Sequence, residues 1–168
     1  MNSLNQLTDS LCEHLKKGKP LLEFKEQLQS YKAHDWQHYI KFGDCCYHRE
    51  IVYQCEQFDL VVISWLANQA SQIHDHPDQG CLMTVLQGQL IETLFTSDPS
   101  HPESTTVKYL DTRILRVGDI GYKEGKSCVH RIEAPIDSIS LHIYSPSKYQ
   151  AKLYNCFGIG ESKCCGSD

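Results

Sequence analysis

The first 40 residues carry an apolar repeat that is typical of amphipathic helices. Its apolar positions recur at spacings of three and four residues: Leu4, Leu7, Leu11 and Leu15. Positions with this spacing share one face of a helix. Ser3 is suited to cap the start of this helix and Gly18-Lys19-Pro20 to end it, and a second helix is predicted from Leu21 to Tyr31. We expect both helices to cover a hydrophobic core and to carry no chemistry.

The pattern changes near Tyr47, where short runs rich in Val, Ile, Tyr, Phe and Leu begin. These runs predict strands at Glu50–Cys55, Leu60–Leu66, Met83–Gln87, Leu90–Phe95, Thr106–Leu110, Ile120–Tyr122, His130–Glu133 and Ser138–Tyr144. Gly88 and Gly118 fall in turns between strands, and Thr96–Ser104 is predicted to be a loop. Many short strands predict a mainly β fold, a small β-barrel or jelly roll with N-terminal helices.

Length and charge narrow the class of protein. The 168 residues fit a single domain (1–168), with helices in residues 1–40 and the barrel at about 47–146. The net charge of 16 − 21 = −5, without a basic stripe, argues against binding to nucleic acid or to an anionic membrane. No apolar stretch is long enough to span a membrane, and the N-terminal segment lacks the core of a signal peptide. We therefore expect a cytoplasmic protein, with a monomer as the default.

Nine cysteines are many for a chain of this length. Because no signal peptide is evident, free thiols are a better interpretation than a disulfide framework. The chain has no pair of CxxC units, so a structural zinc ribbon is not expected. The sequence assigns no role to the cysteines of the C-terminal tail, which are Cys156, Cys164 and Cys165.

The segment from Ser71 to Cys81 holds the most informative pattern, a His-x-His pair at His74 and His76. Residues two apart on an extended segment point to the same side, with Cα atoms roughly 6.5–7 Å apart, so both imidazoles can reach one metal ion. Asp75, between them, points the other way and either supports the ligands from behind or faces solvent. By itself the pair also fits two surface histidines in a polar loop.

The spacing around this pair resembles the first motif of the cupin superfamily. His76 is followed by four residues, Cys81, six residues and Gly88, with cysteine at the position where cupins usually place a glutamate ligand. Gly125 followed by His130 fits the second motif loosely. The resemblance implies a cupin-type β-barrel with a metal held by three histidines: His74, His76 and His130. Three neutral imidazoles leave a ferrous ion its full charge, which favours an anionic substrate such as a thiolate.

Further segments resemble the cysteine dioxygenase family. They are Cys81, Gln87-Gly88 with Glu92-Thr93-Leu94-Phe95, His130-Arg131, and the run from Ser140 to Pro146. Tyr47-His48-Arg49 matches the family's Tyr-x-Arg segment, and Trp65 also fits its pattern. The resemblance covers roughly residues 47–146, and we matched nothing after Lys148.

This resemblance implies a mononuclear Fe(II) enzyme that oxidises L-cysteine with O₂ to cysteine sulfinic acid. Cysteine is then expected to bind through its thiolate and amine, with its carboxylate held by Arg49 and helped by Tyr47. Dioxygen is expected to take the remaining position on the metal. Tyr47 and Arg49 share strand parity, so both are predicted to face the barrel interior. There an arginine needs an anion, which is either the substrate or a protein carboxylate.

Ser140, His142 and Tyr144 alternate along one predicted strand, so all three share a face. They form either an inward relay, with Ser140 orienting His142 and His142 meeting the Tyr144 hydroxyl, or a polar face in solvent. The resemblance implies the inward relay. It also implies a thioether cross-link between Cys81 and Tyr144, for which both partners are present, and a cis Ser145-Pro146 peptide.

Several alternatives stay open. The nearest is the same chemistry on another small thiol acid such as 3-mercaptopropionate, although relatives that use it typically carry glutamine at the position of Arg49. A non-catalytic, metal-binding cupin is a second alternative. A metal-dependent isomerase or decarboxylase ranks lower, because such cupins usually keep the acidic ligand that Cys81 replaces. Imidazole suits iron, nickel and zinc alike.

Overall fold

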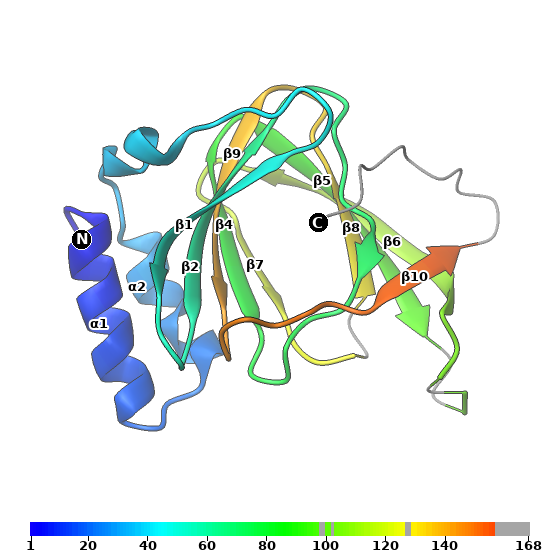
Figure 1. The fold of residues 1–168 in the computed structure, drawn as a ribbon, viewed down its shortest axis with the longest axis horizontal. Coiled ribbons are helices and arrows are strands. Elements are labelled where there is room, and N and C mark those ends of the chain that lie inside the picture. Colours follow the sequence, from blue (N-terminus) through cyan, green and yellow to red (C-terminus); the bar gives the residue numbers. More distant parts are fainter. Residues whose placement is uncertain (98–99, 102, 127–128, 157–168) are drawn as a thin grey trace.

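The N-terminal helices pack on one sheet of a computed structural model that describes residues 1–97, 100–101, 103–126 and 129–156 (Figure 1). Helix α1 spans Leu4–Lys16, and the Ser3 hydroxyl accepts a hydrogen bond from the Gln6 amide at 3.1 Å, which confirms the predicted cap. The face predicted to be apolar is buried, and Leu7 and Leu11 have no exposed surface. The second predicted helix is irregular, with a 3₁₀ turn at Leu21–Phe24 followed by α2 at Lys25–Gln29.

In the part of the chain that the structure describes, ten strands form two sheets, arranged as Figure 1 shows. The first contains, in spatial order, β1 (His48–Gln54), β2 (Asp59–Trp65), β9 (Ser138–Tyr144), β4 (Cys81–Gln87) and β7 (Ile120–Lys123). The second closes on itself in the order β10 (Leu153–Cys156), β3 (Ile73–His74), β8 (Val129–Glu133), β5 (Gln89–Ser97) and β6 (Thr106–Arg116). A further 3₁₀ turn covers Asp35–Tyr39. All eight predicted strands are present, and the mainly β architecture with N-terminal helices is confirmed.

Four features of the second sheet escaped the sequence pattern. Strand β5 runs to Ser97, two residues into the predicted loop Thr96–Ser104, because it pairs with β6, and part of that loop lies outside the described residues. Strand β6 continues to Arg116, six residues beyond its predicted end, because it pairs with β5 as far as the hairpin turn. Its last half carries no apolar alternation, since most of its side chains are exposed. Strands β3 and β10 are too short to show a period, and they exist because they pair with each other.

Strand β9 lies in the middle of the first sheet and is buried on both faces. Leu141 and Ile143 pack in the cluster that includes the helices, whereas Ser140 and His142 point to the opposite face of the sheet. The polar face of this strand is therefore inside the protein, and the alternative of a solvent-exposed edge strand is wrong. The helices thus cover one face of the sheet and leave the other to the site.

The turn at Gly88 between β4 and β5 needs glycine. Its φ is +76°, and a Cβ there would lie 2.4 Å from the Ser138 hydroxyl oxygen.

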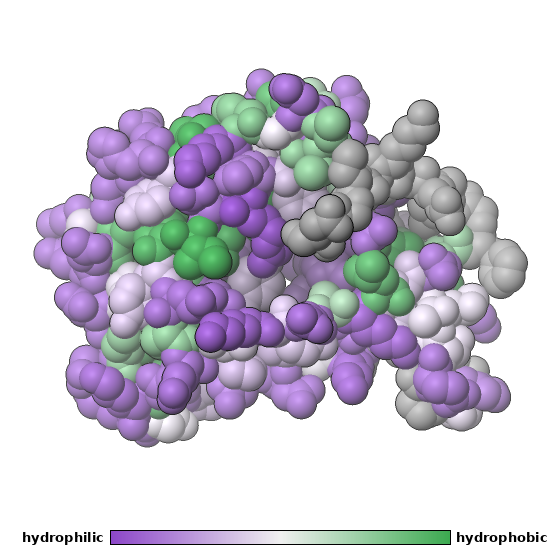
Figure 2. All heavy atoms as spheres, in the orientation of Figure 1, coloured by the Kyte–Doolittle hydropathy of each residue, from purple (hydrophilic) through white to green (hydrophobic). Residues whose placement is uncertain are grey.

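Hydrophilic residues cover most of the face seen in Figure 2, and one group of apolar residues lies over β1 and β2. Among the described residues, no helix is long and apolar enough to cross a membrane.

Candidate active site

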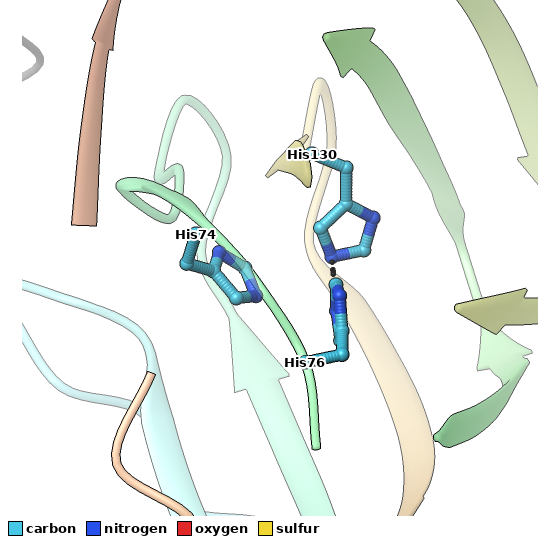
Figure 3. Close-up of side chains that lie close together, drawn as sticks. All are labelled: His74, His76 and His130. Carbon is cyan, nitrogen blue, oxygen red and sulfur yellow. Dashed lines mark hydrogen bonds between the residues drawn. The ribbon is translucent and has the colours of Figure 1, made fainter. Parts of the chain in front are cut away.

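Three histidines converge in the interior of the molecule. One ring nitrogen from each of His74, His76 and His130 lies within 4.8 Å of the others, and the ring centroids are 4.5–5.1 Å apart. Figure 3 shows the rings facing one another, with the Nε2 atoms of His76 and His130 only 3.0 Å apart. The structure therefore brings together the three residues that the His-x-His pattern and the cupin resemblance selected.

Strand pairing creates this cluster. His74 of β3 lies directly opposite His130 of β8 in the antiparallel register, and His76 follows two residues later on the same side. His74 and His130 are 56 positions apart in the chain, so neither strand alone indicates that they meet. The alternative that His74 and His76 are surface residues of a polar loop is wrong, because His76 is buried and His74 is half-buried.

Hydrogen bonds fix which nitrogen each ring offers. The His74 Nδ1 lies 2.8 Å from the Gln72 carbonyl oxygen, and the His130 Nδ1 lies 2.6 Å from the Glu92 carboxylate. Both partners can only accept, so both Nδ1 atoms carry the proton and both Nε2 atoms are available as ligands.

The imidazoles of His74 and His130 are also held neutral. Burial, and then the repulsion that a protonated His130 would exert, lowers the pKa of His74 to about 3, and burial lowers the pKa of His130 below its usual value. Neutral imidazole is the form that ligates a transition metal. Three convergent imidazoles, of which those of His74 and His130 are held neutral, therefore fit a divalent transition-metal cofactor.

Glu92 holds His130 from behind, a role that the sequence analysis did not assign. This carboxylate is completely buried on β5 and is contacted by His130, by Lys123 at 3.1 Å and by Arg113. Burial alone would raise its pKa, but the hydrogen bond from His130 and the charges around it lower the pKa to about 2. The available signal was an acidic residue two positions after Leu90 and two before Leu94, on the apolar face of the predicted strand.

Asp75 is buried, so the expectation that it either supports the ligands or faces solvent resolves in favour of an interior role. Its carboxylate accepts hydrogen bonds from the Tyr149 hydroxyl at 2.9 Å, the Lys152 amide at 2.7 Å and the Tyr154 hydroxyl at 3.1 Å. All three donors come from the segment around β10. Asp75 therefore ties the C-terminal segment to the segment that carries His74 and His76.

Arg49 lies at the edge of the first sheet, and its guanidinium reaches over the Tyr144 ring, 4.9 Å from the centroid. Its Nη1 donates to the Tyr144 hydroxyl at 3.2 Å. The predicted inward direction of Arg49 is thus present, although the residue as a whole keeps exposed surface on the edge strand β1. Within the described ranges no carboxylate forms an ion pair with Arg49, and its charge acts on the cluster by helping to lower the pKa of His74.

The inward face of β9 forms a continuous hydrogen-bonded series. The Ser140 hydroxyl lies 2.8 Å from His142 Nε2, and the Tyr144 hydroxyl lies 3.3 Å from His142 Nδ1. Trp65 of β2 adds to this series through its indole N–H, 3.0 Å from the Ser140 hydroxyl, and its ring stacks on Tyr47 at 4.3 Å between centroids. The side-chain order inferred for the relay is thus present in the structure.

Cys81 faces this series from the neighbouring strand. It lies directly opposite Tyr144 in the β4–β9 register, and its Sγ is 3.9 Å from His142 Nδ1. Burial raises the pKa of the Cys81 thiol to about 12 and also raises the pKa of the Tyr144 phenol, so both groups are protonated at neutral pH. The Ser145-Pro146 peptide that follows Tyr144 is cis, as the resemblance implied.

Comparison with known sequences identifies relatives. The profile of the family "Cysteine dioxygenase type I" matches residues 3–156, which include the N-terminal helices and the segment after Lys148. Cysteine dioxygenase type 1 of Danio rerio is 32% identical over 139 residues, covering 79% of this chain and 69% of the relative. That of Bos taurus is 34% identical over 130 residues, covering 74% and 64%. The matched region thus spans about two thirds of the length of these relatives.

Comparison with solved structures identifies the fold. A protein with a double-stranded β-helix domain from Klebsiella pneumoniae superimposes with a TM-score of 0.58 at 19% identity, covering 74% of this chain and 93% of the other. A cupin superfamily protein from Desulfitobacterium hafniense superimposes with a TM-score of 0.52 at 13% identity, covering 69% and 92%. At these identities the likeness concerns the fold alone, and it confirms the cupin fold.

Proposed function

Because the chain belongs to the cysteine dioxygenase type I family, we propose that it oxidises L-cysteine with O₂ to cysteine sulfinic acid at an Fe(II) centre held by His74, His76 and His130. The observation that carries the proposal is the convergence of three imidazoles whose surroundings include the charge of Arg49. The geometry supports the metal site, and membership of the family supports the reaction.

The metal fits the donor set. His74 and His130 each offer an unprotonated Nε2. The third ring, His76, directs its Nε2 toward that of His130, and a bound cation would replace this contact between the two nitrogens. When bound, Fe(II) supplies a Lewis-acidic centre that binds the thiolate and activates O₂. The remaining work of binding, orientation and hydrogen bonding belongs to the side chains around it.

Arg49 is the residue that binds the carboxylate of cysteine. Its planar guanidinium can hold a carboxylate through two parallel hydrogen bonds, and no protein carboxylate among the described residues competes for it. Its exposed position leaves it accessible to an incoming substrate. Tyr47 supports the same region by packing on Trp65. Small thiols that lack a carboxylate, such as cysteamine, would leave the Arg49 guanidinium without this partner.

Tyr144 is the residue that hydrogen-bonds the substrate within the site. Its hydroxyl is held by Arg49 and by His142, which is itself held by Ser140. Such a held hydroxyl meets the reacting groups without first having to be ordered. Tyr144 therefore contacts the substrate, whereas His142 and Ser140 orient the Tyr144 hydroxyl.

We expect replacement of Glu92 by glutamine to weaken Fe(II) binding about 10- to 100-fold, the usual cost of losing a hydrogen-bonded partner behind a metal ligand. The amide cannot hold the His130 Nδ1–H with the same charge, and it leaves Lys123 without its carboxylate. Competition with a chelator measures the affinity. Glu133→Gln, on the outward face of the same region, is the matched control, and equal affinities of the two variants would contradict the role of Glu92.

We also propose that a thioether forms between Cys81 and Tyr144 during turnover. The S–H and one aromatic C–H bond break, a C–S bond forms, and O₂ takes up the two electrons and two protons. The support is their opposed position on β4 and β9. The expected result is an intact-mass loss of two hydrogens, about 2 Da, mapped to a joined Cys81–Tyr144 peptide and absent in Cys81→Ala. Peptides that stay separate after many turnovers would remove this proposal.

The central experiment is anaerobic loading with Fe(II), addition of L-cysteine, and admission of oxygen. The readouts are O₂ uptake and mass-spectrometric identification of the product, with 3-mercaptopropionate run in parallel. One O₂ consumed per cysteine sulfinate formed is the expected result. Preference for 3-mercaptopropionate would support the proposed iron site but contradict L-cysteine as the substrate. Bound iron without O₂ uptake from either thiol would favour a non-catalytic metal-binding cupin.

A further inference from the structure

Trp65 makes a contact to the relay that the proposed reaction does not use. Its indole N–H lies 3.0 Å from the Ser140 hydroxyl oxygen, and both side chains are buried, with exposed fractions of 2% and 0%. The contact joins neighbouring strands β2 and β9, and the same indole stacks on Tyr47. The contact has a direction, because an indole N–H can only donate.

This direction propagates along the relay. The Ser140 oxygen accepts from Trp65, and the only other hydrogen-bond partner of its hydroxyl in the described residues is His142 Nε2 at 2.8 Å. If Nε2 carried the ring proton, the serine would receive two donors and its own buried proton would have no acceptor. Leaving a buried donor unsatisfied costs free energy, so the Ser140 hydroxyl donates and Nε2 is the acceptor.

The proton of the His142 ring is then on Nδ1. Burial, followed by the charge of Arg49, lowers the pKa of His142 well below its usual value, so the ring is neutral and carries one proton. Nδ1 faces the Tyr144 hydroxyl oxygen at 3.3 Å, and Arg49 donates to the same oxygen at 3.2 Å. With two donors on its oxygen, Tyr144 keeps its own O–H proton for an acceptor on the side of Cys81 and the site.

We propose that Trp65 is a positioning residue whose indole N–H fixes the Nδ1–H tautomer of His142 and thereby makes Tyr144 a hydrogen-bond donor toward the bound substrate. The tautomer follows from the geometry alone, whereas its consequence for turnover rests on the proposed function. Trp65 acts through Ser140 and His142, and it is not required to touch the substrate. A structural role alone would predict a change in stability without a change in tautomer.

The test is the tautomer of His142, measured by long-range ¹H–¹⁵N NMR correlation on the full chain loaded with diamagnetic Zn(II). His142→Gln identifies the signal by its loss. Trp65→Phe keeps an aromatic ring beside Tyr47 and removes the N–H, and the ratio of the Nε2–H to the Nδ1–H form should rise at least about fivefold, the effect of one neutral hydrogen bond. Ser140→Ala should release the tautomer in the same way, through a different residue.

Trp36→Phe is the matched control, because Trp36 is equally buried but lies in the cluster beneath the helices. It should leave the His142 tautomer unchanged. An Nε2–H form in the unsubstituted protein, or an Nδ1–H form retained in both Trp65→Phe and Ser140→Ala, would overturn the proposal.

The iron-loaded protein supplies the second readout. Trp65→Phe should lower kcat with L-cysteine about tenfold, part of the usual contribution of a positioned proton donor, while KM changes less than about twofold. A tautomer shift without any cysteine turnover in the unsubstituted protein would contradict the proposed function and leave the tautomer assignment standing. A tautomer shift with unchanged kcat would overturn the catalytic meaning of the Trp65 contact.

Discussion

Replacement of His76 by alanine is expected to abolish iron retention and to lower kcat/KM for L-cysteine by about 10³-fold or more, because the metal centre contributes several kcal/mol to the reaction. His76 directs its Nε2 at that of His130, so its loss leaves two ligands where the cluster had three. Two imidazoles without a carboxylate do not hold Fe(II) firmly. Iron content after desalting and O₂ uptake with cysteine measure the two effects.

His38→Ala is the matched control, because His38 is exposed on the 3₁₀ turn at Asp35–Tyr39 and makes no contact with the cluster. It should retain iron and activity. The metal-free forms of the His76→Ala variant and of the unsubstituted protein should unfold at similar temperatures, which separates loss of metal from loss of fold. Full iron content with turnover within tenfold of the unsubstituted protein would contradict the three-histidine site.

Replacement of Arg49 by glutamine is the second large effect. We expect kcat/KM for L-cysteine to fall about 10²- to 10³-fold, the usual cost of removing one partner of a hydrogen-bonded charge pair at a binding site, with most of the change in KM. The amide keeps a donor but loses the charge and the planar fork that holds a carboxylate through two bonds. Steady-state kinetics with L-cysteine and 3-mercaptopropionate measure the change, and the preference ratio should move toward the latter.

Cysteamine is the matched substrate for this variant, because it lacks the carboxylate that Arg49 is proposed to bind. Any turnover of cysteamine should change less than about threefold in Arg49→Gln, within the range of a single weak contact. Lys41→Gln removes a positive charge from an exposed residue that pairs with Glu50, which lies on the same strand as Arg49. This variant should leave the kinetics with cysteine unchanged. Equal losses with cysteine and cysteamine would show that Arg49 serves the site in another way than by binding the carboxylate.

Local pattern was sufficient for much of this protein. Helix α1 and its Ser3 cap, and strand β9 with its bounds Ser138–Tyr144, follow from period and from capping chemistry. So does the shared face of His74 and His76, because alternate residues of an extended chain point the same way. These features depend on residues that are close in sequence, where backbone geometry alone relates one side chain to the next.

Which face is inside, and which strands are neighbours, was decided by the tertiary structure. Parity placed Ser140 and His142 on one face, but only the position of β9 between β2 and β4 buries that face and brings Trp65 and Cys81 to it. The same is true of Glu92, a buried acidic residue of β5 whose role is evident only when β5 pairs with β8 and His130 contacts it.

Arg49 gives the clearest contrast between the two levels. Sequence parity predicted an inward arginine, and its side chain does reach Tyr144, yet the residue is exposed because β1 is an edge strand. The sequence by itself determined the residue types and the local direction of their side chains. Only the register between strands distant in the chain decided which side chains meet and which remain open to a substrate, because those contacts depend on the packing of the whole barrel.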